Sequence, residues 1–186
     1  HRKILVVNND DEDYLNISDL INQIPSGDYL VEWCDRYDHA LDKMKSDQYD
    51  LYFVDQGLGP RTGVDLLIEA CQGGCEMPVI ILSNDVDPQV YRMALQAVAY
   101  DLLIRSELNS EKLGRCIRHS LDRSDSLKAL KASEIRYRSI FEKAKDMVFI
   151  ASSNFEIVEV NYAATDLLDY DIDELIGKDL TELFVN

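Results

Sequence analysis

Residues 4–105 alternate between two hydrophobic periods, and this alternation is the strongest constraint on the fold. Short apolar runs of strand length are separated by segments in which apolar residues recur every three or four positions. The runs are Ile4–Val7, Tyr29–Cys34, Leu51–Val54, Val79–Leu82 and Leu102–Ile104. Strands that alternate with helices in this way predict an α/β fold with a doubly wound, five-stranded parallel sheet.

Three of these runs differ from the others in being apolar almost throughout. They begin at Ile4, Leu51 and Val79, and a strand of this kind is typical of a sheet covered by helices on both faces. The single tryptophan, Trp33, falls in the second run, and we expect it to pack on that strand.

The segment after the fifth run predicts one long helix over residues 111–144. It contains no proline and one glycine, Gly114, in its first turn. At the usual helical rise it would be about 50 Å long, more than the core of a domain this size needs. A coiled-coil spacing of three and four, with one polar break, joins Leu127, Leu130, Glu134, Tyr137, Phe141 and Ala144. We expect this helix to connect domains and to pair with a second copy of the chain; the alternative is a solvated helix lying on the first domain.

The remainder of the chain predicts part of a second domain. Two strands and two helical segments are expected at Met147–Ala151, Glu156–Val160, Tyr162–Leu168 and Ile172–Leu175. Two strands do not make a stable sheet alone, so we interpret them as the front half of a domain. The predicted division is a first domain over 1–124, a helical linker over 125–144 and a truncated domain over 145–186.

Charge excludes some classes of partner. The chain has 19 Lys and Arg against 35 Asp and Glu, a net charge of −16, which repels nucleic acid and anionic membranes. No apolar run approaches the length of a membrane span. The four cysteines form no metal-binding pattern, and reduced thiols are typical of the cytoplasm. We therefore expect a cytoplasmic protein without nucleic-acid binding or membrane insertion.

Polar residues follow the apolar runs at the points where the strands should end. The carboxyl ends of parallel strands share one edge of the sheet, where ligands bind in such folds. The residues expected on this rim are Asn8, Asn9, Asp55, Ser83 and Arg105. Neighbouring strands are about 4.8 Å apart, so these side chains can converge.

Several stretches resemble the motifs of response-regulator receiver domains of two-component signalling. They are KILVVNNDDEDYL, YDLYFVDQGLGPRTGVDLL, PVIILSN and AVAYDLLIRSEL. RYRSIFEKAKDMVFIASSNFEIVEVNYAATDLLDYDIDELIGKDLTELF is similar to the first half of PAS domains. In this resemblance Asn161 corresponds to an asparagine that caps the following helix. The implied architecture is a flavodoxin-like receiver, a helical linker and a partial α+β PAS segment.

The resemblance assigns roles on the rim. In receivers a carboxylate accepts a phosphoryl group from a histidine kinase while a divalent cation bridges the reacting oxygens. This makes Asp55 the phosphoacceptor, Ser83 the hydroxyl that binds the phosphoryl group, and the carbonyl of Gly57 a ligand of Mg²⁺.

Two parts of the receiver site are altered in this chain. Asn8 and Asn9 occupy the positions of an acidic pair, and Arg105 occupies that of a lysine. An amide can ligate Mg²⁺ but brings no charge, and a unit-charge pair at about 4 Å is worth roughly 4 kcal/mol at an effective dielectric of about 20. Arginine keeps the positive charge as a planar fork, and we expect it to pair with Asp55. The metal site is expected to be weak or lost.

An alternative alignment rescues part of the metal site. A shift of one residue would pair Asn9 with Asp10, so the metal set becomes Asn9, Asp10, Asp55 and Gly57. We expect no shift, because Asp13 and its successors fit the receiver pattern without it. A separate possibility from another class is an enzyme with an acidic metal site of Asp10, Asp11 and Asp55.

The sequence thus favours a receiver degenerate at its metal site, which relays conformational or dimerisation state through the helix to the PAS segment. The alternative is a Mg²⁺-dependent receiver phosphorylated on Asp55. The expected partners are a histidine kinase or another signalling protein, and a second copy through residues 111–144. We expect neither haem nor flavin in this segment, and an output domain beyond Asn186, such as a histidine kinase or a cyclic-dinucleotide enzyme.

Overall fold

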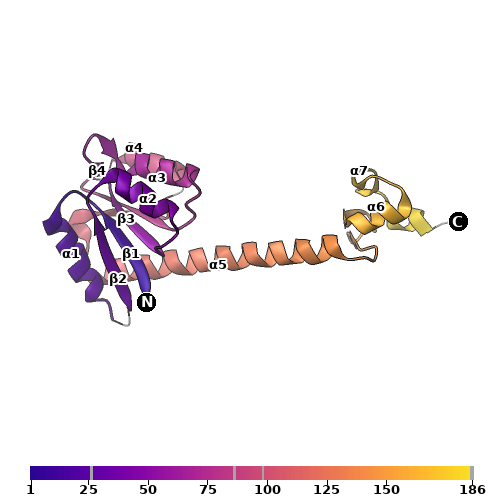
Figure 1. Ribbon diagram of the computed structural model, residues 1–186, viewed down its shortest axis with the longest axis horizontal. Helices are drawn as coiled ribbons and strands as arrows, with labels where there is room; N and C mark the ends of the chain where they lie inside the picture. Colours follow the sequence, from indigo (N-terminus) through magenta and orange to yellow (C-terminus); the bar gives the residue numbers. More distant parts are fainter. Residues whose placement is uncertain (26, 86, 98, 185–186) are drawn as a thin grey trace. The chain divides into compact units, whose positions relative to one another are not determined.

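The computed structural model describes residues 1–25, 27–85, 87–97 and 99–184. These residues form two compact units, His1–Ser126 and Leu127–Asn186. One helix, α5 (Ser110–Lys143), runs from the first unit into the second (Figure 1).

The first unit is built on the predicted five-stranded parallel sheet. Its strand order is β2-β1-β3-β6-β7, and every neighbouring pair is parallel. The strands are β1 (Arg2–Val7), β2 (Tyr29–Cys34), β3 (Leu51–Asp55), β6 (Val79–Ser83) and β7 (Asp101–Ile104). The three runs that are apolar throughout, in β1, β3 and β6, lie at the centre of the sheet, which confirms the fold class predicted from periodicity.

Helices cover both faces of this sheet. They are α1 (Asp11–Asn22), α2 (Tyr37–Lys45), α3 (Gly63–Gln72), α4 (Pro88–Gln96) and the first part of α5. One buried cluster joins α2, α3 and α4 to side chains such as Val7 and Val54. The other joins α1 and α5 to Val6 and Phe53. Adjacent strand residues therefore point to opposite layers, as the pleat requires.

The loop after β3 carries a feature that the periodicity did not predict. A small antiparallel pair, β4 (Gly57–Leu58) and β5 (Arg61–Thr62), precedes α3. Thr62 caps α3 in a reciprocal box: its hydroxyl accepts from the Asp65 N–H, and the Asp65 carboxylate accepts from the Thr62 N–H. This box fixes the path of the chain between Asp55 and α3.

The second unit contains the expected two strands and two helices. They are β8 (Phe149–Ala151), β9 (Ile157–Val160), α6 (Tyr162–Leu168) and α7 (Ile172–Leu175), followed by a 3₁₀ turn, η2 (Leu180–Phe184). The strands are antiparallel. Ile157, Val160, Ala164 and Leu175 form the buried centre of this unit.

Asn161 does not cap α6 as the resemblance implied. It occupies the N-cap position without a capping bond, because its amide is buried and fully used elsewhere. The oxygen accepts from the Val148 N–H, and the nitrogen donates to the carbonyls of Phe141 and Asp146. Asn161 therefore ties the end of α5 to the segment that leads into β8.

The tightest packing constraint near the end of β3 is at Gly63. A Cβ there would lie 2.9 Å from the carbonyl carbon of Asp55 and closer still to its oxygen. We predict that Gly63→Ala lowers the free energy of unfolding by about 1–3 kcal/mol, because backbone must move to admit the methyl group. Urea unfolding of the full chain measures this.

Gly57→Ala is the matched control for Gly63→Ala. Its methyl group would meet only Oδ2 of Asp55, at 3.7 Å, an ordinary contact. Equal losses of stability in the two variants would contradict the steric explanation.

Candidate functional site

Expected rim residues lie at the carboxyl edge of the parallel sheet, and Asn8 directly follows β1 there. Asp55 ends β3 and Ser83 ends β6, while Arg105 begins the 3₁₀ turn η1 (Arg105–Glu107) directly after β7. The register aligns Asp55 with Leu82 of the neighbouring strand. The parallel topology therefore brings residues about 50 positions apart in sequence to one edge.

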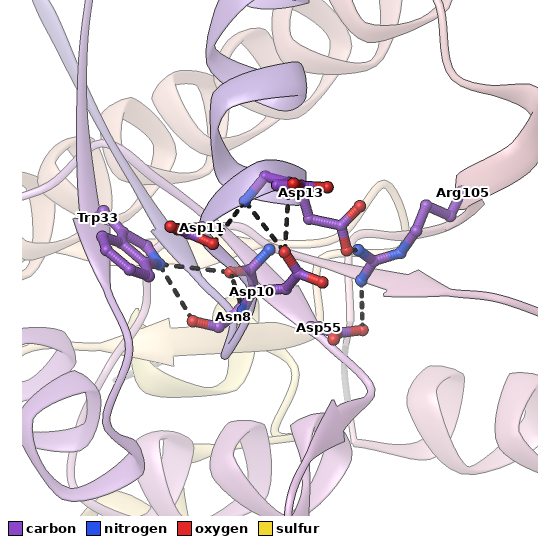
Figure 2. Close-up of polar contacts among 8 residues, drawn as sticks. Asn8, Asp10, Asp11, Asp13, Trp33, Asp55 and Arg105 are labelled. Atoms are coloured by element: carbon purple, nitrogen blue, oxygen red, sulfur yellow. Dashed lines mark hydrogen bonds and ion pairs between the residues drawn. The ribbon is translucent and has the colours of Figure 1, made fainter.

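Arg105 joins two carboxylates on this edge. Its Nη2 lies 2.7 Å from Oδ1 of Asp55, and its Nη1 pairs with Oδ2 of Asp13. Figure 2 shows the guanidinium between the two acids. The side chains of Arg105 and Asp55 are only 15% and 16% exposed, whereas that of Asp13 is 32% exposed, so the triad consists of a largely buried ion pair and a more exposed second acid. The expected pairing of Arg105 with Asp55 is present; the contribution of Asp13, from the first turn of α1, was not anticipated.

Burial and pairing act in opposite directions on the charges of this triad. Burial raises the pKa of Asp55, and the negative charge of Asp10 adds to that effect. The N–H groups of Gly57 and Gln56 hydrogen-bond to the Asp55 carboxylate and lower its pKa, and the guanidinium at 2.7 Å also favours the ionised form. Burial lowers the pKa of Arg105. Each charge therefore depends on the other for its compensation.

Asn8 is fully buried and holds the end of β1 to β2. Its Oδ1 accepts from the Asp10 N–H at 3.0 Å and from Trp33 Nε1 at 3.3 Å, and the same indole donates to the Asn8 carbonyl at 3.1 Å. Trp33 in turn stacks on Tyr14 of α1, with ring centroids 5.5 Å apart. Among the described residues, Nδ2 of Asn8 has no hydrogen-bond partner. The oxygen of Asn8 thus serves the loop and the indole (Figure 2).

The acidic run after Asn8 serves the helix. Asn9 and Asp10 are exposed, and Asp10 is the N-cap of α1, accepting from the N–H groups of Glu12 and Asp13. Negative side chains in this first turn interact favourably with the helix dipole and stabilise the helix. Across the described ranges, no group of three or more His, Cys, Asp or Glu side chains has the arrangement of a metal site.

The hydroxyl of Ser83 points to backbone. Ser83 is buried, and its Oγ donates to the carbonyl of Asp85 at 2.9 Å. Ser83 therefore lies on the rim as expected, and its hydroxyl hydrogen-bonds to the loop after β6.

Two residues of the site were missed from the sequence. In the sequence Asp13 is one of several acids at the start of a helix, with nothing to distinguish it from its neighbours. Trp33 was expected only to pack on its strand. The sequence position of Asp13 could have indicated its role. Asp13 lies three residues after the N-cap Asp10, in the first turn of α1, and an acid there is close enough to the rim to pair with a cation.

We predict a pH dependence when the cation of the triad is removed. Arg105→Met keeps apolar volume but leaves Asp55 buried, so the pKa of Asp55 in the folded protein, which burial already raises, moves further above its unfolded value of about 3.9. In this variant ionised Asp55 is more stable in the unfolded chain, where water solvates it, than in the folded protein, where it is buried without a cation. The contribution of Asp55 to the stability of this variant should be most favourable below about pH 4 and be lost as the pH rises from there through the raised folded pKa.

Arg105→Met/Asp55→Asn isolates the contribution of Asp55 in this experiment. Both variants keep Asp13, so the difference between their urea midpoints over about pH 4–7 reports Asp55 alone. The prediction is wrong if the two midpoints run parallel across this range.

Comparisons with known proteins agree with this geometry. The family model described as response regulator receiver domain matches residues 4–117, and the model described as PAS fold matches residues 135–186. No curated protein matches the chain significantly. None of the described helices is long and apolar enough to cross a membrane.

Solved structures share the fold of the first unit. A response regulator receiver domain protein (CheY-like) from Methanospirillum hungatei JF-1 is 21% identical, with a TM-score of 0.60, covering 67% of this chain and 97% of that one. The N-terminal domain of a response regulator/sensory box/GGDEF 3-domain protein from Carboxydothermus hydrogenoformans is 24% identical, with a TM-score of 0.58 and coverages of 67% and 98%. A response regulator receiver domain protein from Clostridium thermocellum is 22% identical, with a TM-score of 0.61, and the match covers 68% of this chain and 99% of that one.

The sheet order, the rim residues and the family match agree with one another. The chain belongs to the response-regulator receiver family and carries a PAS segment after its receiver domain.

Proposed function

We propose that this receiver is degenerate at its metal site and relays conformational or dimerisation state through α5 to the PAS segment and an output domain. One observation carries the proposal: Arg105 holds the Asp55 carboxylate in a buried ion pair. In this role the domain docks with a histidine kinase or another signalling protein without depending on Mg²⁺.

The residues present do not fit a divalent cation well. Of the expected set, Asn9 is neutral and exposed, and the carboxylate of Asp10 caps α1. Asp55 is paired with Arg105, which leaves the carbonyl of Gly57 as the remaining ligand. In proteins Mg²⁺ keeps several waters and is usually held by one or two carboxylates, and both carboxylates of this set are already engaged, Asp10 by the N-terminus of α1 and Asp55 by Arg105.

Arg105 supplies the positive charge that a metal would otherwise bring. To expose Asp55 to a phosphoryl donor, the guanidinium must leave it, and breaking a buried ion pair typically costs about 3–5 kcal/mol. Asp13 holds the same guanidinium from the other side, which further favours the paired state. The site therefore favours a conformation in which Arg105 stays paired with Asp55 and the carboxylate is not available to a phosphoryl donor.

The alternative function is a Mg²⁺-dependent phosphoacceptor. It is favoured by the placement of Asp55 and Ser83 at the ends of the adjacent strands β3 and β6. The two functions differ in whether Asp55 is phosphorylated.

Acetyl phosphate with Mg²⁺, followed by intact mass spectrometry, separates them. We predict no phosphoryl adduct on the natural sequence. Asn8→Asp/Asn9→Asp/Arg105→Lys restores two acids and a compact ammonium, and should gain an adduct. Adding Asp55→Asn to that variant should abolish the adduct. Stoichiometric labelling of the natural sequence at Asp55 would overturn the degenerate assignment.

The partner proposed for α5 is a second copy of the chain. Leu127 and Leu130 begin the predicted coiled-coil stripe and are 50% and 66% exposed. Further along the stripe Phe141 is 8% exposed and stacks with Tyr137 inside the second unit. The proposed dimer seam, the stretch of α5 that packs against the second copy, is therefore shorter than the predicted stripe from Leu127 to Ala144. It centres on Leu127 and Leu130.

We predict that the 186-residue chain sediments as a dimer and that Leu130→Glu shifts it towards monomer. A buried charge at an apolar seam position is strongly unfavourable. Ile135→Glu is a matched control, since Ile135 is 63% exposed and outside the stripe. A monomeric natural sequence, or equal dissociation by both variants, would contradict the seam.

A further inference from the structure

A second polar site lies between β7 and the first half of α5. A cavity of about 410 Å³ opens there, and its polar lining includes Tyr100, Asp101, Lys112, Arg115, His119 and Arg123. None of these residues belongs to the ion triad at Asp55. We propose that this cavity binds a small phosphate-bearing ligand.

The basic residues of the cavity form one face of the helix. Lys112, Arg115, His119 and Arg123 are spaced by three, four and four positions, and residues so spaced share a helix face. The chain as a whole has 16 more acidic than basic charges, the difference of 35 and 19. A cluster of basic side chains around one cavity therefore runs against the overall charge.

These basic groups differ in how far they are already neutralised. Lys112 pairs with Glu107 at 2.6 Å, and the guanidinium of Arg123 lies over the ring of Tyr100, 4.9 Å from its centroid. Within the described part of the chain, no carboxylate pairs with Arg115. The cavity thus offers two arginines without an acidic partner, and arginine forks match the geometry of phosphate oxygens.

One acid also faces the cavity. The Asp101 carboxylate accepts from the Leu102 N–H at 2.8 Å and from the Cys116 thiol at 3.3 Å. Burial, together with Asp101, raises the pKa of Cys116 to about 12, so the thiol stays protonated and keeps donating. Asp101 repels an anion, yet the two arginines without an acidic partner outnumber it, and its remaining lone pairs can accept from ligand hydroxyl groups.

The size and chemistry of the cavity limit the ligand. Its volume lies in the range of about 300–1,000 Å³ seen for small-molecule sites. Arginines for phosphate oxygens and a carboxylate for hydroxyls fit a phosphate ester such as a nucleotide. Inorganic pyrophosphate shares the phosphate chemistry without the hydroxyls, so the two sources can be separated by experiment.

Isothermal titration of the full chain with ADP and with pyrophosphate, without divalent cations, tests the proposal. Arg115→Gln and Arg123→Gln should each weaken binding about tenfold or more, the typical loss of one charge-assisted hydrogen bond. Arg118→Gln is the matched control, an exposed arginine on the same helix outside the cavity lining. Circular dichroism verifies that the variants are folded.

Each outcome decides the proposal. Binding of ADP more tightly than pyrophosphate, with adenosine not binding, supports a phosphate ester; similar binding of both supports an inorganic anion. Adenosine binding as tightly as ADP would refute recognition of phosphate. Absence of heat with both ligands at millimolar concentration, or equal weakening by Arg118→Gln, would also overturn the assignment.

Discussion

The ion triad of Arg105 with Asp55 and Asp13 is the interaction on which the site depends. It joins three separate elements: the end of β3, the first turn of α1 and the turn after β7. The charges of Arg105 and Asp55 are mostly buried, and buried charges are tolerated only when they are paired, so removing Arg105 leaves the Asp55 carboxylate uncompensated. Arg105 therefore places at the rim a positive charge that the chain carries covalently.

The two amides at the end of β1 are consistent with this arrangement. Asn8 is fully buried and hydrogen-bonds to the indole of Trp33 and to the Asp10 N–H. A carboxylate at the same place would add a further negative charge beside Asp10, Asp13 and Asp55. One guanidinium cannot compensate that many acids, whereas a neutral amide keeps the hydrogen bonds without the charge. A neutral amide at position 8 is therefore compatible with a single cation at position 105.

The sequence predicted the sheet and most of the rim, because both follow from period and topology. Each apolar run became a strand within two residues of its expected ends, and Asp55, Ser83 and Arg105 lie where strand ends must lie. What was missed depends on side-chain direction. Asp13 turns back to Arg105 instead of facing water, Asn161 binds the C-terminal end of α5 instead of capping α6, and Phe141 is covered inside its own unit. Spacing along a helix does not reveal which of several exposed neighbours a tertiary contact will cover.

The position of Trp33 gives the protein a native optical reporter. It is the only tryptophan in the chain, and its indole nitrogen binds Asn8 at the mouth of the site while its ring, 38% exposed, stacks on Tyr14. Its emission therefore originates next to the loop between β1 and α1. Any rearrangement of that loop alters the hydration of the indole, so a change in wavelength or intensity can follow the state of this domain without an attached dye.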